Sequence, residues 1–146
     1  MNRLVGVLAA FLIPAVDATA GAFCDQMSAL MEQGDAITLA LPDAEAPATC
    51  AVSRSLAGGL ERHCHWVFPY RSAEASAAFE AVLEAVTACL GPGISVRTDE
   101  SVNHPDSYDL RIIEQKDAVF AVFAVSLKDK AALQATLVFL RLPISP

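Results

Sequence analysis

Four cysteines constrain this chain of 146 residues more than any other feature of its sequence. They are Cys24, Cys50, Cys64 and Cys89. An even number of cysteines in a short exported chain is typical of a disulfide framework. None of the pairs has the two-residue spacing of a zinc ribbon or of a thioredoxin-like redox motif. We therefore expect two disulfides rather than a metal site made of cysteines.

The N-terminus has the three parts of a secretory signal peptide. Arg3 provides the positive start, residues 4–16 form the apolar run, and Ala18-Thr19-Ala20 is the small-residue sequence that precedes a cleavage site. The apolar run is too short for a membrane anchor, since spanning a bilayer takes about 20 residues. We expect residues 1–20 to be removed and residues 21–146 to fold as a single domain in the periplasm or outside the cell.

Charge and hydropathy exclude two classes of protein. The 17 acidic and 10 basic residues give a net charge of −7, and loss of residues 1–20 removes one charge of each sign, Arg3 and Asp17. Nucleic-acid binding depends on clustered cations, so a nucleic-acid partner is not expected. A hydrophobic fraction of 54 % with a charged fraction of 18 % is the opposite of the composition of disordered chains. The chain can therefore bury a core.

The spacing of apolar residues predicts two helices. Residues 22–33 place apolar side chains at helical intervals and are followed by Gly34, which suits a helix end. Residues 72–90 form a longer apolar stripe. Ser72 is an expected N-cap, and Gly91-Pro92 is an expected stop signal.

The strands are predicted from alternation of polar and apolar residues. The runs 49–56 and 60–68 flank Ala57-Gly58-Gly59, which is typical of a hairpin. Residues 37–41 are a further candidate strand, and the polar residues 97–107 are predicted to be a loop.

Three more strand-like runs follow at residues 108–114, 118–127 and 133–142, and they are typical of an antiparallel meander. Residues 130–135 are also compatible with a helical turn. The element order predicts an α+β fold, an antiparallel sheet of about five strands with two helices packed on one face. Run 118–127 is apolar on both faces, so either the sheet curls or its second face meets another chain.

The expected hairpin also predicts a disulfide pairing. A three-residue turn at residues 57–59 makes Cys50 and Cys64 diagonal rather than facing neighbours, which disfavours a bond between them. Cys89 lies near the end of the second predicted helix, which runs back along the preceding strand to the level of Cys64. The predicted pairs are therefore Cys64 with Cys89 and Cys24 with Cys50.

Two histidines are candidate binding residues. His63 and His65 project from the strand face opposite Trp66, and two imidazoles in this spacing can chelate zinc or copper, with Glu61 as a third ligand. The alternative is a pair of solvated or partner-facing histidines, because an isolated H-x-H is a weak motif.

Other candidate binding residues belong to the hairpin and its exit. Arg54 and Arg62 are predicted to face each other across the hairpin, an unfavourable pair unless carboxylates or an anionic partner lie between them. Tyr70 lies at the corner between the second hairpin strand and the following helix.

The loop at residues 99–107 collects groups used in acid–base and nucleophilic chemistry. Asn103, His104 and Asp106 are its candidate binding residues, and Ser101 or Ser107 could join His104 and Asp106 in a catalytic group. These residues lie too close together in sequence to make a triad without a scaffold, and no G-x-S-x-G nucleophile motif occurs in the sequence. A recognition loop is favoured over catalysis, and the alternative is a plain turn, in which Asn, His-Pro and Asp-Ser are common.

The sequence thus predicts an exported, periplasmic binding or accessory domain without enzymatic activity and without a cofactor, such as an inhibitor or immunity-type protein. Its acidity would suit a basic protein partner. A second copy of the chain is another candidate partner, and no membrane contact is expected after signal cleavage. The alternative function is a periplasmic metal-binding protein that uses His63 and His65. A small hydrolase that depends on His104 is the third.

Overall fold

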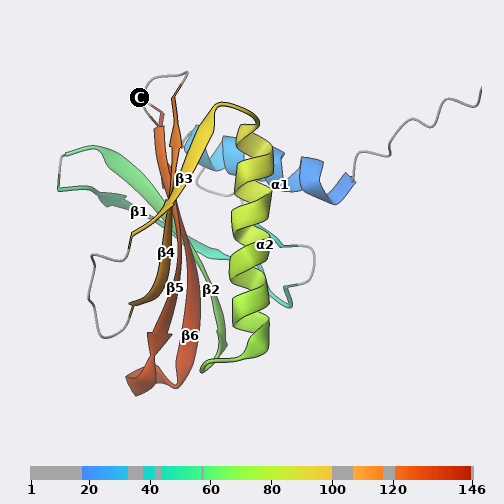
Figure 1. The fold of residues 1–146 in the computed structure, drawn as a ribbon, viewed down its shortest axis with the longest axis vertical. Coiled ribbons are helices and arrows are strands. Elements are labelled where there is room, and N and C mark those ends of the chain that lie inside the picture. Colours follow the sequence, from blue (N-terminus) through green and yellow to red (C-terminus); the bar gives the residue numbers. More distant parts are fainter. Residues whose placement is uncertain are drawn as a thin grey trace, which may run out of the picture.

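The computed structural model describes residues 18–32, 38–41, 44–56, 58–99, 107–116 and 121–145. Two helices lie on one side of a six-stranded antiparallel sheet and cross each other there (Figure 1). The predicted α+β class is confirmed, with six strands rather than about five. The elements are α1 (Ala18–Met31), β1 (Thr49–Arg54), β2 (Leu60–Pro69), α2 (Ala73–Leu90), β3 (Ile94–Thr98), β4 (Ser107–Gln115), β5 (Ala121–Lys130), the short 3-10 turn η1 (Ala131–Leu133) and β6 (Ala135–Pro143).

The strand order across the sheet is β1-β2-β6-β5-β4-β3. The predicted hairpin is present as β1 and β2, and the predicted meander as β4, β5 and β6. The predicted loop at residues 97–107 is wrong at its start, because Arg97 and Thr98 belong to the edge strand β3. The turn η1 occupies part of the segment, residues 130–135, that was compatible with a helical turn.

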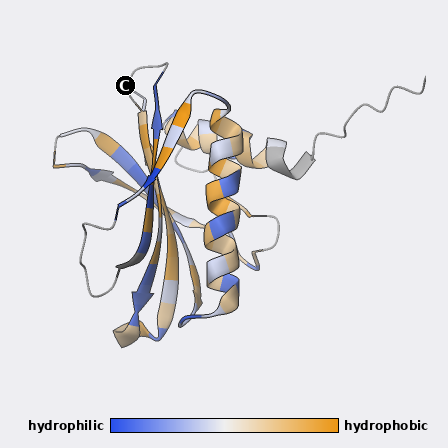
Figure 2. Cartoon of the chain, in the orientation of Figure 1, coloured by the Kyte–Doolittle hydropathy of each residue, from blue (hydrophilic) through white to orange (hydrophobic). Residues whose placement is uncertain are grey.

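The core lies between the helices and the sheet face that they cover. Phe79, Val82 and Val86 of α2 are buried there, as are Phe23 and Leu30 of α1. The sheet contributes alternate residues of its central strands, namely Trp66, Ile113, Phe123, Val125, Val138 and Leu140. Figure 2 shows polar and apolar residues alternating along α2, as expected for a helix with one buried side.

Helix α2 has the ends that the sequence predicts. Its N-cap is Ser72, whose side-chain oxygen accepts a hydrogen bond of 3.2 Å from the backbone N–H of Ala75. At the other end Gly91 has a φ of 68°, a conformation that glycine adopts without strain, and its N–H bonds to the carbonyl of Thr87. Within the described residues, neither helix has the length and hydropathy needed to cross a bilayer.

The structure has two disulfides, but the predicted pairing is wrong. Cys50 is bonded to Cys64 and Cys24 to Cys89. The error lies in the hairpin register, since Arg54 pairs with Leu60 and the turn therefore takes five residues, 55–59, instead of three. This register places Cys50 directly opposite Cys64, with a Cα–Cα distance of 4.0 Å.

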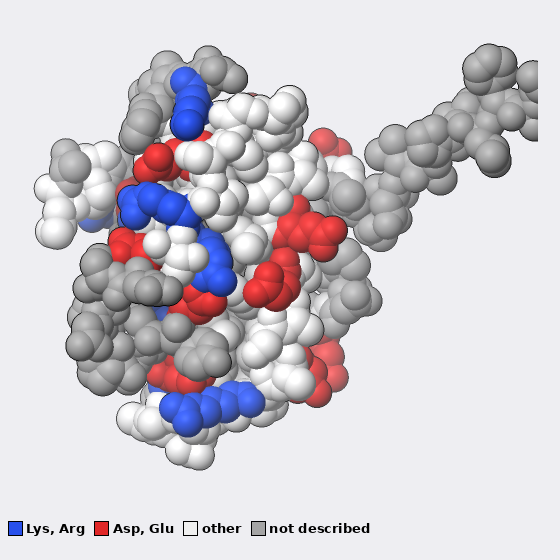
Figure 3. Space-filling model, viewed as in Figure 1, with Lys and Arg blue, Asp and Glu red and all other residues white. Residues whose placement is uncertain are grey.

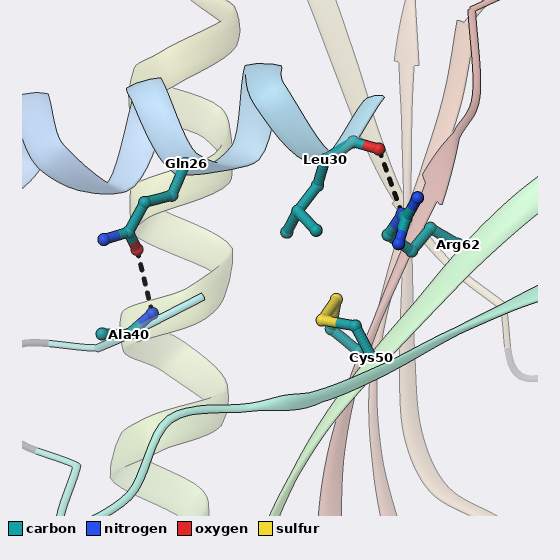
Figure 4. Close-up of a disulfide and its surroundings, with 6 residues drawn as sticks. Gln26, Leu30, Ala40, Cys50 and Arg62 are labelled. Carbon is teal, nitrogen blue, oxygen red and sulfur yellow. Dashed lines mark hydrogen bonds between the residues drawn. A yellow bond between two sulfur atoms is a disulfide. The ribbon is translucent and has the colours of Figure 1, made fainter. Parts of the chain in front are cut away.

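Helix α1 is joined to the rest of the domain by the Cys24–Cys89 disulfide and by a hydrogen bond near its C-terminus. Near the Cys50–Cys64 disulfide, the buried Arg62 donates from Nε to the carbonyl of Leu30 at 3.1 Å (Figure 4). This carbonyl belongs to the last turn of α1, where backbone acceptors lack helical partners. A cation at this position also interacts favourably with the negative end of the helix dipole.

The segment after α1 is not the predicted strand within its described residues, 38–41. The backbone N–H of Ala40 donates to Oε1 of Gln26 at 3.0 Å (Figure 4). The carbonyl of Leu39 accepts from the N–H of Ala48 at 2.8 Å. Residues 38–41 therefore satisfy backbone groups through a side chain and a loop instead of a strand ladder.

Candidate functional site

The candidate site is the sheet face opposite the two helices, which we call the open face. Among the described residues no helix or strand packs on it, so its side chains are free of the main core. Six side chains of the open face form its central group: His63 and His65 of β2, Ser126 and Lys128 of β5, and Phe139 and Arg141 of β6.

Strand register brings these residues together. His63 pairs with Arg141, and His65 pairs with Phe139 across β2 and β6. On the other side of β6, Phe139 pairs with Ser126 of β5. Because paired residues of antiparallel strands point to the same face, these side chains are lateral neighbours on the open face.

Phe139 is the aromatic centre of the group. Its ring centroid lies 5.4 Å from that of His65, with the planes tilted by 36°. The ammonium nitrogen of Lys128 lies 5.0 Å from the same centroid, a cation–π distance. The benzyl ring thus separates an imidazole on β2 from an ammonium on β5.

Lys128 is a half-buried cation among other cations. Burial lowers its pKa below the ordinary value of 10.5, and the positive charges of Lys130 and Arg141 lower it further. The three causes have the same sign, because each makes the charged ammonium less favourable. The surroundings of Lys128 therefore disfavour its charged form.

Arg141 is the second such cation. It lies between His63 of β2 and Ala124 of β5, and its Nε is buried without a hydrogen-bond partner in the part of the chain that the structure describes. A buried donor without an acceptor costs free energy, and native proteins contain few of them. Arg141 therefore reduces the stability of the fold at this position.

On the side of the open face toward β4, small and apolar side chains lie next to this group. Ala124, Ser126 and Ile112 point to the open face but are only 7–8 % exposed. Phe123 and Val125, which alternate with them, are in the helix-side core. Residues 121–125 of β5 are thus apolar on both faces as predicted, while residues 118–120 of the predicted run lie outside the described chain.

The predicted pairing of Arg54 with Arg62 is wrong. In the observed register Arg62 faces Val52, and Arg54 faces Leu60. Arg62 is buried against α1, and Arg54 donates to the carbonyl of Gly58 at 2.8 Å inside the hairpin turn. Neither arginine lies on the open face, and the five-residue turn is the reason that the two are not opposed.

Tyr70 contributes to a structural corner at the end of β2. The guanidinium of Arg71 lies 5.0 Å from the centroid of its ring and donates to Oδ2 of Asp129 at 2.9 Å. The hydroxyl of the buried Thr136 donates to Oδ1 of the same carboxylate at 2.7 Å and accepts from the N–H of Arg71. These bonds hold the β2–α2 connection to β5 and β6.

The two histidines lie on the open face, opposite Trp66, and no third described ligand joins them. Nε2 of His63 is 3.6 Å from Oε2 of Glu61, and His65 stacks on Phe139. The described chain holds no group of three His, Cys, Asp or Glu side chains that could bind one ion. The other predicted site residues, Asn103, His104 and Asp106, lie outside the described residues, as does Ser101.

Lys128, Phe139 and Arg141 were not singled out from the sequence. The signal is the alternation in β6, where Leu137, Phe139 and Arg141 alternate with buried aliphatic residues. A cation inside an otherwise apolar strand marks the face that the core does not use. No protein-family model, curated protein or solved structure matches the chain.

Proposed function

We propose that the protein is an exported accessory protein without enzymatic activity that binds another protein through the open face. The observation that carries the proposal is the one-sided covering of the sheet. Both helices pack on the same face, whereas the open face presents Val67, Leu137 and Phe139 with no described element above them. Apolar side chains on such a surface favour contact with a second chain.

The disulfides support the exported location. Structural disulfides are typical of chains that fold in oxidising compartments such as the periplasm. Here both of them join elements of the folded domain, α1 to α2 and β1 to β2. The predicted signal peptide at residues 1–20 provides the route, and its expected cleavage site lies in the first turn of α1.

Site-specific photocrosslinking in the cells that produce the protein tests the proposal. Val67 is 63 % exposed on the open face, so p-benzoylphenylalanine in its place should yield a discrete crosslinked species on irradiation. The same residue in place of Ala81, which is exposed on α2, is the matched control. The proposal is wrong if Val67 captures nothing, or if both positions capture the same products.

A further inference from the structure

We propose that the open face recognises a short, carboxylate-rich segment of its protein partner, with Lys128 and Arg141 as the anchoring cations. This inference rests on the proposed function, because it names the chemistry of the partner at the same surface. It also departs from the expectation drawn from net charge, which favours a basic partner.

The placement of the two cations is the first step. Lys128 pairs with Leu137, four residues from Arg141 along β6. Their backbone positions are therefore about 14 Å apart at about 3.4 Å per residue. An extended segment that carries carboxylates at alternate positions presents them on one side at about 7 Å intervals, so that residues i and i+4 match this separation.

The missing counter-charge is the second step. Among the described residues, the buried Nε of Arg141 has no hydrogen-bond acceptor, and Lys128 lies beside an aromatic ring and other cations. Arg97, on the edge strand β3, is also on the open face, but it forms ion pairs with Asp99 and Glu114. A carboxylate from a partner would supply Lys128 and the guanidinium of Arg141 with the negative charge that Arg97 finds in its own chain.

The surface also discriminates among anionic occupants. Glu61 and Glu114 lie on the open face in the row next to Arg141, on the side away from Lys128, where they repel a long, uniformly charged polyanion. Phe139 and Leu137 beside the cations provide apolar contact that a protein segment can use. A second open face carries Lys128 and Arg141 as well as carboxylates, so it offers these cations less negative charge than an acidic segment does. A short acidic protein segment fits these constraints better than nucleic acid, a sulfated glycan or a second open face.

Charge is also distributed unevenly over the rest of the molecule. Glu74, Glu80 and Glu84 are exposed on α2. Figure 3 shows carboxylates without cations on the right of the molecule, over α2, and cations interspersed with carboxylates to their left. The net charge of −7 therefore describes the helical side better than it describes the centre of the open face.

Fluorescence anisotropy with a defined peptide tests the inference. The probe is a fluorescein-labelled decapeptide of alternating glutamate and serine, and its lysine–serine counterpart is the charge control. We expect the glutamate peptide to bind the folded, oxidised protein at low salt and the lysine peptide not to bind at the open face. Lys128→Met and Arg141→Met should each weaken binding by at least about fivefold, because each removes one anchoring charge.

Arg54→Met is the matched control, since it removes one positive charge from the hairpin turn and leaves the open face unchanged. Its affinity should stay within about twofold of the unsubstituted protein, because screened charges away from the contact matter little. The melting temperature of each variant verifies that it is folded. The inference is wrong if the glutamate peptide does not bind, or if Arg54→Met weakens it as much as Arg141→Met.

Two further arms identify other occupants. Phosphatidylglycerol vesicles and heparin are tested at the same ionic strength with the same variants. If either binds more tightly than the peptide and loses affinity in Arg141→Met, the occupant is a lipid surface or a polyanion, and the inference is overturned. A partner captured at Val67 through a segment without acidic residues would also overturn it while leaving the proposed function intact.

Discussion

Arg141 shows how a single residue can oppose the stability of the fold that carries it. Its neighbours Phe139 and His63 offer no negative charge, and its Nε is buried without an acceptor. Arg62 is the opposite case, because its buried Nε donates to the last turn of α1. The two arginines therefore differ in whether the fold supplies an acceptor for the Nε that it buries.

Arg141→Met should raise the free energy of unfolding by about 1 kcal/mol, because methionine keeps the apolar stem and removes an unsatisfied donor. Arg62→Met should lower it by about 2 kcal/mol, because it leaves the carbonyl of Leu30 without its charged donor. Urea denaturation of the oxidised proteins measures both values. A loss of stability in Arg141→Met equal to that in Arg62→Met would show that Arg141 is structural.

The lowered pKa of Lys128 predicts the direction in which the free energy of unfolding changes with pH. Its pKa is lower in the folded chain than the ordinary 10.5, so in the window between these values the unfolded chain binds more protons. The free energy of unfolding therefore rises with pH there, and the penalty on the charged ammonium is fully present below that window. The stability gained by Lys128→Met should be largest near pH 7 and should shrink toward pH 10.5. A pH-independent difference between the two proteins would contradict this assignment.

At the scale of the elements, the sequence predicts best where local chemistry decides. The N-cap Ser72 and the stop at Gly91 define α2 to within a residue, because each satisfies backbone groups at a helix end. Strand β3 was missed because Ile94–Thr98 has only five residues, in which Ile94 and Val96 are the only apolar ones, and because it is ordered by pairing with β4. Edge pairing depends on distant residues, so local patterning does not reveal it.

The hairpin register is the element-scale error with the widest effect. Ala57-Gly58-Gly59 is compatible with turns of more than one length, and the turn that forms differs by two residues from the predicted one. A shift of two keeps every side chain on its predicted face, so His63 and His65 still lie on the open face. It changes which residues are opposite each other. Cys50 therefore faces Cys64 and bonds to it, and Cys24 pairs with Cys89.

The two disulfides should differ in their contribution to stability. Cys24 and Cys89 are separated by 65 residues, and Cys50 and Cys64 by 14. The chain-entropy model gives about 4 kcal/mol for the longer loop and about 3 kcal/mol for the shorter one. Cys24→Ala with Cys89→Ala should therefore destabilise the protein more than Cys50→Ala with Cys64→Ala, as measured by urea denaturation. The reverse order would show that the longer crosslink strains the packing of α1 on α2.

For the molecule as a whole, the net charge and the charge of the open face predict different kinds of partner. Composition gives −7 and favours a basic partner, but the sheet register gathers Lys128, Arg141 and two histidines from three strands on one face. The sequence gives each residue's strand face through alternation, but it does not give the order of the strands. The central group could therefore not be predicted, because β6 must first be placed between β2 and β5.

The nested disulfides have a consequence for how the protein is made. A chain that enters an oxidising compartment from its N-terminus delivers Cys24 and Cys50 before the other two thiols. Joining thiols in order of arrival produces a crosslink that the finished molecule lacks, since Cys24 ends on Cys89. Correcting it requires exchange through a mixed disulfide. Efficient maturation of this protein is therefore expected to need an isomerase that reshuffles early crosslinks as well as an oxidase that forms them.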